Sequence, residues 1–399
     1  MKADFLNNGD KKMCCGCGSC AQKCLYKCIT LKADEEGFLY PEIDKSTCVN
    51  CGLCRVACPL SKDKSDDDIS DAIIYGGYIK NDLVRASSSS GGAFTALAES
   101  FCDEEYVIFG AEMDDEFNVF HSYIESKAEL DRFRKSKYLQ SDMRNTYTEV
   151  KSFLDKGKKV LFSGTPCEIA GLNLFLNKSY ENLLTVDVLC HSVPTVKWFN
   201  KEKEWIEKKS KCRVCSVDFR NKDNATWDRY RMVWRLENNK QKTWIKDPFI
   251  VAWNAALISR PSCYDCRFAC KKRVSDVTIG DLWGVHKFAS HLYGENKGVS
   301  FFLLNTEKGA KYFDKIKDKL VYDKVSFDDV AANNPRLLRP MEWNEKRDQF
   351  IRKMDTMTFG DMMRLLPKTN YFSLIVCRIL SRETKNKLSR ILKRIKKNK

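Results

Sequence analysis

Two matched groups of four cysteines near the N-terminus constrain this chain more than any other feature of its sequence. Both follow the spacing C-x2-C-x2-C-x3-C, and Pro59 comes directly after the second. The first group is Cys14, Cys17, Cys20 and Cys24, and the second is Cys48, Cys51, Cys54 and Cys58. This is the ligand spacing of a chain that binds two [4Fe–4S] clusters. Gly16, Gly18 and Gly52 favour it further, because glycine lets the backbone curl tightly around a cluster.

In paired motifs of this kind, the fourth cysteine of each run ligates the other cluster. The spacing therefore predicts one cluster on Cys14, Cys17, Cys20 and Cys58, and a second on Cys48, Cys51, Cys54 and Cys24. Cys15 and Cys28 are then spare. A pair of zinc knuckles or an oxidised cysteine cluster fits less well, because zinc has no use for two matched quartets of this pattern. Leu25 stands where a proline usually follows the fourth cysteine, and proline there binds no iron.

Length and composition leave room for an enzyme behind this segment. The chain has 399 residues, of which 43% are hydrophobic and 12% aromatic, as in globular domains. No run of 18 apolar residues exists, and residues 1–10 lack the apolar stretch of a secretory signal, so we expect a cytoplasmic protein. Residues 378–399 hold ten basic residues and one acid, so this tail contributes nine of the net charge of +15. The rest is mildly basic, and we expect no nucleic-acid partner.

The chain after the cysteine groups alternates patterns typical of strands and of helices. Strands are expected at residues 72–80, 106–113, 159–162, 183–189 and 277–280, and helices at 93–101, 143–156, 167–176 and 195–209. This succession predicts an α/β body with a mixed or parallel sheet, behind an α+β ferredoxin-like two-cluster domain. The predicted divisions are 1–62, a linker at 63–71, an N-terminal part of the body at 72–158, a C-terminal part at 159–340 and a basic helical tail at 341–399.

A serine- and glycine-rich stretch opens the helix expected at residues 93–101. Residues 85–98 read RASSSSGGAFTALA. Amides and hydroxyls at the start of a helix suit a phosphate, such as the pyrophosphate of a flavin dinucleotide. An ordinary loop with a helix cap remains the open alternative, because no G-x-G-x-x-G is present.

Four cysteines of the body stand near the expected strand ends. Cys167 begins a helix after the strand in VLFSGTPC, where the helix dipole favours a thiolate. Cys190 ends the strand in LLTVDVLC. If these strands are parallel neighbours, both cysteines reach the carboxyl edge of the sheet, where α/β folds place their sites. Cys263 and Cys266 form a C-x2-C pair that could complete a quartet.

Several of these motifs, in this order, resemble the beta subunits of coenzyme F420 hydrogenases and dehydrogenases. The likeness covers residues 14–305 and includes the ferredoxin-type motifs, SSSGGAFTALA, KSKYLQS (residues 135–141), SGTPCEIAGL, LCHSVP, CYDC and DVTIGDLWG. Two positions depart from the family pattern, since Glu168 stands where glutamine is common and Ser192 where glycine is usual.

The resemblance implies cofactors and site residues for the body. It implies a third [4Fe–4S] cluster on Cys167, Cys190, Cys263 and Cys266. It also implies FAD, bound near Ser88, Ser89, Ser90, Gly91, Gly92, Thr95, Lys135, Lys137 and Tyr138. It implies an oxidoreductase that passes electrons between its clusters and a hydride carrier (deazaflavin coenzyme F420 or nicotinamide) or a ferredoxin. Relatives with a fused ferredoxin segment accompany cell-surface polysaccharide synthesis, so the resemblance extends to that role.

Other cysteines and histidines favour structural roles. Cys212 and Cys215 lie too far from the other C-x2-C pair for a zinc ribbon, and we expect them at packing or edge positions. Among the four histidines only His191, beside Cys190, is expected near a cofactor. Trp283 fits a cofactor neighbour or a buried core residue about equally well.

Two classes of function remain open from the sequence. The first is the flavin-dependent iron–sulfur oxidoreductase, and the second is a non-catalytic electron-relay subunit that docks a partner enzyme. In the tail, Leu388, Ile391, Leu392 and Ile395 recur at helical spacing among basic residues. This predicts either a basic amphipathic helix, suited to peripheral contact with the inner membrane face, or a solvated, frayed terminus.

Overall fold

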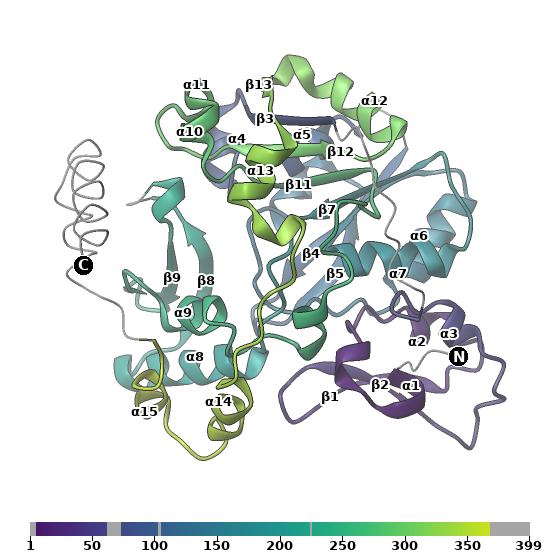
Figure 1. The fold of residues 1–399 in the computed structure, drawn as a ribbon, viewed down its shortest axis with the longest axis vertical. Coiled ribbons are helices and arrows are strands. Elements are labelled where there is room, and N and C mark those ends of the chain that lie inside the picture. The colour runs from purple at the N-terminus through teal and green to yellow at the C-terminus, as the bar shows by residue number, and fades with distance from the viewer. Residues whose placement is uncertain (1–4, 62–72, 103–104, 224–225, 368–399) are drawn as a thin grey trace, which may run out of the picture.

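The computed structural model describes residues 5–61, 73–102, 105–223 and 226–367. Its centre is an eight-stranded sheet, flanked by an N-terminal segment on one side and by a smaller three-stranded sheet on another (Figure 1). The eight strands run in the order β13-β3-β12-β11-β7-β6-β4-β5. Their bounds, in chain order, are β3 (Ile73–Ile79), β4 (Tyr106–Met113), β5 (Val119–Ile124), β6 (Lys159–Gly164), β7 (Leu183–Val188), β11 (Val277–Asp281), β12 (Ser300–Leu304) and β13 (Leu320–Lys324).

The sheet is mixed, which confirms the α/β body expected from the sequence. Strands β4, β6, β7 and β11 are parallel neighbours, while β5, β12 and β13 each pair antiparallel with their neighbours. The strands come from both predicted parts of the body, on either side of residue 158. Since the parallel strands end at one edge, the loops after β6 and β7 lie side by side there.

Both faces of the sheet are covered by helices, because the central strands are apolar on both sides. In β6, Leu161 faces the cluster formed with α5 (Ala93–Glu99) and α12 (Glu307–Ile316). Its neighbours Val160 and Phe162 face α6 (Thr146–Asp155) and α7 (Pro166–Leu176) instead. All three side chains are fully buried. Each contributes about 1.5–3 kcal/mol to folding through the apolar surface that it removes from water.

A second core surrounds the small sheet. This antiparallel sheet has the order β10-β9-β8 and packs against four helices. The elements are β8 (Val214–Asn221), β9 (Arg231–Leu236), β10 (Gln241–Thr243), α8 (Val196–Ser210), α9 (Pro248–Asn254), α14 (Arg347–Lys353) and α15 (Phe359–Met363). Phe350 and Phe359 contact the indole of Trp198 in this core. Residues 347–363 of the predicted tail therefore belong to a folded core.

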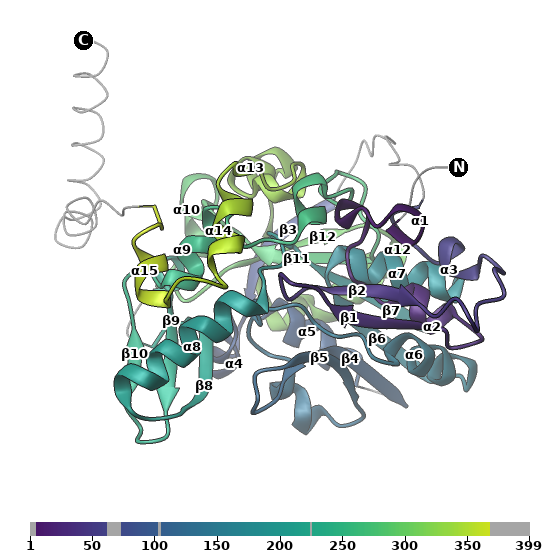
Figure 2. The ribbon, with the colours of Figure 1, turned by 90° about the horizontal axis from the view of Figure 1, so that it is seen from below.

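The N-terminal segment is a two-stranded antiparallel hairpin with three short helices. The elements are α1 (Phe5–Asn8), α2 (Ser19–Lys23), β1 (Ile29–Ala33), β2 (Leu39–Ile43) and α3 (Leu53–Val56). It lies against α6 and α7 of the body (Figure 2). Ser19 donates a hydrogen bond to the carbonyl oxygen of Gly171 over 3.0 Å, and Lys23 donates to that of Phe175 over 2.6 Å. The remaining α-helices of the described residues are α4 (Asp82–Ser87), α10 (Val285–Phe288), α11 (Ser290–Tyr293) and α13 (Phe327–Asn333).

Within the described ranges, no helix has both the length and the apolar character needed to cross a membrane. The amphipathic stretch expected at residues 388–395 lies outside those ranges.

Candidate functional site

Four cysteines of the body line one small cavity at the carboxyl edge of the large sheet. Cys167 lies in the first turn of α7, directly after β6, and Cys190 lies two residues after β7. Cys263 and Cys266 come from a short 3-10 turn, η4 (Pro261–Asp265), and the residue after it. The cavity has a volume of about 50 Å³ and is bordered by all four. The structure thus brings together the residues predicted to hold the third cluster.

The turn that positions Cys167 is built by a capping box. Thr165 caps α7, and the Glu168 carboxylate accepts a hydrogen bond from the Thr165 amide over 2.7 Å. The hydroxyl of Thr165 lies 3.2 Å from the sulfur of Cys167. This cap fixes the first turn of the helix and with it the cysteine.

Burial, and then the closeness of neighbouring cysteines, disfavours the charged form of these thiols. Burial, followed by the proximity of Cys266, raises the pKa of the Cys263 thiol to about 12. Burial, followed by the proximity of Cys167, raises the pKa of Cys266 to about 11. Thiolates held this closely need cationic neighbours, and the irons of a cluster would supply them. The donor set therefore fits a [4Fe–4S] cluster. Among the described residues no three His, Cys, Asp or Glu side chains converge on a single metal ion.

Cys15 borders the same cavity, a position that the spacing argument left spare. Its thiol and that of Cys167 share a hydrogen bond, which is the first cause of the raised pKa of Cys167, before burial. The Cys15 thiol also shares a hydrogen bond with that of Cys17, so Cys15 lies between Cys167 of the body and the first quartet.

The first N-terminal quartet gathers in the pairing that the motif predicts. After burial, the groups that raise the pKa of Cys20 are Cys14 and Cys58. A hydrogen bond with Cys15 lowers the pKa of Cys17, but burial and then the proximity of Cys20 and Cys58 raise it above its ordinary value. Cys58 of the second motif therefore lies with the first three cysteines.

The second quartet is nearer the surface. Cys24 is buried, and its sulfur lies 3.3 Å from that of Cys28. The thiol of Cys28 in turn shares a hydrogen bond with that of Cys48. Burial raises the pKa of Cys54, and the proximity of Cys51 raises it further. Cys51 is solvent-exposed.

A second, larger cavity of about 520 Å³ contains most of the residues predicted to hold the flavin. Eight of the nine line it, namely Ser88, Ser89, Ser90, Gly92, Thr95, Lys135, Lys137 and Tyr138. Gly91 does not line it, and its amide donates a hydrogen bond to the Ser300 hydroxyl over 2.9 Å. The volume falls within the range of cofactor sites, so the cavity fits a flavin.

Lys137 is a half-buried cation in the lining of this cavity. Its ammonium donates hydrogen bonds of 2.8 Å to the carbonyl oxygens of Arg132 and Arg134. Burial lowers the pKa of Lys137 to about 7. A phosphate beside this ammonium would stabilise its charged form.

Another wall carries side chains that the sequence analysis did not select. Arg220 pairs with Asp281, and the Arg220 guanidinium lies 4.4 Å from the centre of the Tyr230 ring. Trp283 stacks on Trp227, with the rings 4.7 Å apart and inclined by 6°. Of these side chains, only Trp283 is a candidate cofactor neighbour from the sequence.

The two cavities share a wall made of residues 189–193. His191 faces both, as expected for the histidine beside Cys190, and burial lowers its pKa. Ser192 has a φ of 141°, a conformation that favours glycine, the residue expected at this position from the family resemblance. Its hydroxyl accepts a hydrogen bond from the Trp253 indole over 2.7 Å.

Cys212 and Cys215 line neither cavity. Cys212 packs against the core of the small sheet, and Cys215 is exposed on β8. These are the packing and edge positions expected for the pair.

One family model matches part of this chain. Residues 157–330 match the model of the C-terminal region of the beta subunit in coenzyme F420 hydrogenases and dehydrogenases. No curated protein matches. Among solved structures, a chain of the F420-reducing [NiFe] hydrogenase complex from Methanosarcina barkeri aligns with a TM-score of 0.42 and 12% identity. That alignment covers 73% of this chain and 90% of the other.

Proposed function

We propose that this chain is an iron–sulfur flavoprotein oxidoreductase of the coenzyme F420 hydrogenase/dehydrogenase beta-subunit family, because residues 157–330 match the model of the C-terminal region of that subunit. It passes electrons between its [4Fe–4S] clusters and a hydride carrier, either a deazaflavin such as coenzyme F420 or a nicotinamide, or a ferredoxin. The family supports an oxidoreductase. The cofactors and the carrier are our proposal.

The observation that carries the proposal is the wall shared by the two cavities. The larger cavity is lined by the residues expected to hold FAD, and the smaller by the four cysteines expected to hold the third cluster. Cys190 belongs to both linings. A flavin in the larger cavity would therefore lie directly beside the cluster.

This arrangement meets the chemical need of the reaction. A flavin, when bound, accepts two electrons together and releases them singly, as iron–sulfur clusters require. The residues of this chain would enclose the flavin and place charged groups around it. Lys137 offers a half-buried cation to a phosphate, and the Arg220–Asp281 pair fixes a polar group among the aromatic rings of another wall.

The cysteine quartets extend the path toward the surface. Cys15 borders the body cavity, and the two cysteines nearest to it in the chain, Cys14 and Cys17, belong to the first predicted cluster. Cys51, in the second predicted cluster, is exposed. We place the contact with a redox partner protein at that surface, and electrons would pass through the clusters in series.

The test is cofactor analysis of the anaerobically purified protein with a matched pair of lysine variants. We expect about twelve irons and one FAD per chain. Lys308 is the control for Lys137, because its ammonium also caps two carbonyl oxygens, those of Tyr180 and Leu183, at 2.8 and 2.9 Å, but it lines neither cavity. Lys137→Met should weaken FAD binding about tenfold, a loss of about 1.4 kcal/mol, whereas Lys308→Met should not.

Donor screening then identifies the hydride carrier. Reduced coenzyme F420, NADH and NADPH are each added anaerobically, and bleaching of the visible absorption marks the carrier that delivers hydride. Full iron without any FAD would instead support the alternative proposal, a non-catalytic relay subunit that docks a partner enzyme.

The basic tail suggests a location for this activity. We propose peripheral contact with the inner membrane face through residues 388–395, with service to cell-surface polysaccharide synthesis as the role that the family resemblance implies. Truncation after residue 381 should abolish binding to anionic liposomes, and unchanged binding would refute the membrane contact.

A further inference from the structure

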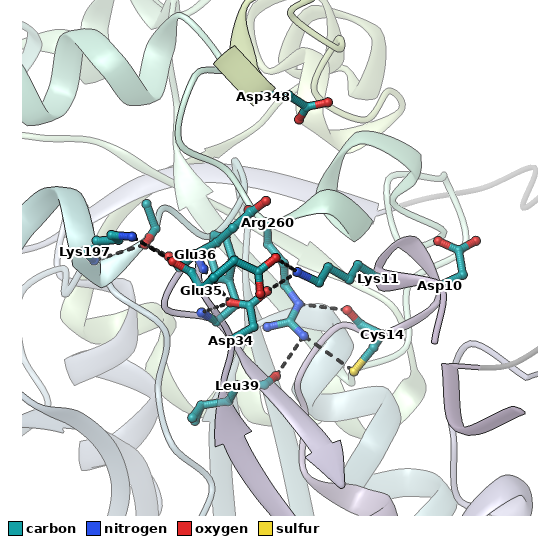
Figure 3. Close-up of polar contacts among 12 residues, drawn as sticks. Asp10, Lys11, Cys14, Asp34, Glu35, Glu36, Leu39, Lys197, Arg260 and Asp348 are labelled. Carbon is teal, nitrogen blue, oxygen red and sulfur yellow. Dashed lines mark hydrogen bonds and ion pairs between the residues drawn. The ribbon is translucent and has the colours of Figure 1, made fainter. Parts of the chain in front are cut away.

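Arg260 is a fully buried arginine at the junction between the N-terminal segment and the body. Its guanidinium donates hydrogen bonds to the carbonyl oxygens of Cys14 and Leu39, over 2.8 and 2.9 Å, and to the side-chain oxygen of Gln140, over 3.0 Å. A fourth contact runs to the sulfur of Cys14 over 3.5 Å (Figure 3). One buried side chain thus joins a cysteine loop, a strand of the hairpin and the body.

The charge of Arg260 has no carboxylate partner among the described residues. Its acceptors there are two carbonyls, an amide oxygen and a thiol. Three of the four other buried arginines differ, since Arg220 pairs with Asp281, Arg273 with Asp187, and Arg347 with Glu36. The fourth, Arg85, binds the Gly298 carbonyl oxygen and, among the described residues, has neither a carboxylate partner nor a hydrogen bond to a cysteine. Burying a cation without a counter-ion costs several kcal/mol of folding free energy, so an anion beside Arg260 would stabilise the folded protein.

The backbone around Arg260 lies between the first and the third predicted cluster sites. The Cys263 amide donates to the Arg260 carbonyl oxygen over 3.0 Å, within the same turn. On the other side, a β-carbon added to Gly16 would lie 2.8 Å from the guanidinium, so only glycine lets the cysteine loop approach this closely. Arg260 therefore lies between Cys14 of the first predicted cluster and Cys263 of the third.

We propose that Arg260 is the counter-cation of the cluster held by Cys14 and sets the reduction potential of that cluster. The proposal rests on the function proposed above. A four-iron cluster with four thiolates is an anion and gains one more negative charge when it accepts an electron. A fixed guanidinium beside one ligand sulfur stabilises the reduced form more than the oxidised form, and arginine cannot lose its proton to escape this role.

The test is an anaerobic redox titration of the holoenzyme, followed by the EPR signals of the reduced clusters. In Arg260→Gln, one cluster should become harder to reduce by at least tenfold in its reduced-to-oxidised ratio, which equals about 59 mV for one electron. Arg260→Lys keeps the charge and should recover most of the shift. Arg85→Gln removes a buried arginine whose guanidinium binds the Gly298 carbonyl oxygen, away from this junction, and should leave all potentials unchanged.

If Arg260→Gln loses iron, its cluster potentials no longer test the proposal, and a second variant tests the role of Arg260 instead. Gln140→Glu leaves Arg260 in place and sets a carboxylate against its guanidinium, so the same cluster should shift in the same direction. Unchanged potentials in a fully loaded Arg260→Gln, or in Gln140→Glu, would overturn the role of Arg260 while leaving the proposed function intact. A wild-type protein without reducible clusters would overturn both.

Discussion

Cys167 and Cys212 are both half-buried thiols of the body, yet their surroundings differ. Cys167 borders the small cavity with three other predicted ligands, whereas Cys212 packs against the core of the small sheet. Cys167→Ser should therefore lower iron from about twelve toward eight per chain and interrupt electron flow between flavin and the N-terminal clusters. The measurement is iron content together with reduction of the N-terminal clusters by the hydride carrier.

The matched control is the Cys212→Ser/Cys215→Ser double variant, which should keep its iron and flavin. The reverse pattern, with iron lost from the double variant and kept in Cys167→Ser, would contradict the site.

Residue spacing indicates candidate ligands where they are local and does not reveal contacts where distant chain segments meet. The quartets are read from the sequence because one loop supplies three cysteines of each. Cys15 was left spare because its partner, Cys167, is 152 positions away and becomes a neighbour only when α2 packs on α7. Arg220 and Asp281 were missed for the same reason, since they pair across 61 positions.

A buried pair of carboxyl groups should make stability depend on pH. Glu202 is fully buried in α8, and neither of its carboxylate oxygens has a hydrogen-bond partner among the described residues. Burial, followed by the proximity of Asp247, raises the pKa of Glu202 well above its usual range. The folded state then binds more protons than the unfolded state above the ordinary carboxyl pKa, so stability falls as pH rises through that range.

Glu202→Gln should flatten this dependence by up to about 1.4 kcal/mol per pH unit, which is the limit for one group. Denaturant unfolding between pH 5 and 8 measures it. Glu204→Gln, on the exposed face of the same helix, is the control and should retain the slope. Identical slopes in Glu202→Gln and the wild type would exclude the pair as the cause.

At the scale of elements, the strands and helices of the large sheet were predictable. The strand expected at 106–113 coincides with β4, and those at 159–162 and 183–189 differ from β6 and β7 by no more than two residues at either end. Apolar runs flanked by turn residues mark these strands because both faces are covered. The packing of α14 and α15 was not predictable, since their basic surroundings resembled a solvated tail while Phe350 and Phe359 fill the core around Trp198.

Helix α7 makes a close contact with the first cysteine loop. A β-carbon added to Gly171 would lie 3.0 Å from the sulfur of Cys17 and 3.0 Å from the Tyr147 hydroxyl. In an ordinary helix interior, Gly→Ala stabilises by about 0.5–1 kcal/mol. Here the added methyl should instead push the loop away, so Gly171→Ala should destabilise the protein and lower iron at the first cluster.

Gly360→Ala provides the comparison, because its added β-carbon would meet nothing closer than 3.8 Å in α15. It should be neutral or slightly stabilising. Thermal unfolding and iron analysis of both variants test the contact, and a stabilised, fully loaded Gly171→Ala would argue against it.

At the scale of the whole molecule, the N-terminal segment is attached to the body by buried charges as well as by apolar packing. Arg347 of α14 is almost fully buried and pairs with Glu36, in the turn between β1 and β2. Its guanidinium also donates to the Ser259 carbonyl oxygen over 2.9 Å. This ion pair ties the hairpin to the helix beside the small sheet and so holds the predicted cluster sites in register.

Glu36→Gln should loosen this attachment without unfolding the body. The substitution leaves the Arg347 guanidinium buried with a single carboxylate, that of the half-exposed Asp348 at 3.0 Å, and breaking a buried pair costs about 3 kcal/mol. Hydrogen exchange should accelerate in β1 and β2 but stay slow in β6 and β7. Glu35→Gln is the matched control, because the neighbouring Glu35 carboxylate is 74% exposed and pairs with Lys11 at the surface, where an ion pair contributes less than about 1 kcal/mol. Equal exchange in the two variants would mean that apolar packing alone holds the segment. Faster exchange confined to Glu36→Gln, accompanied by slower electron transfer from flavin to the N-terminal clusters, would establish that this ion pair maintains the distance that the electrons must cross.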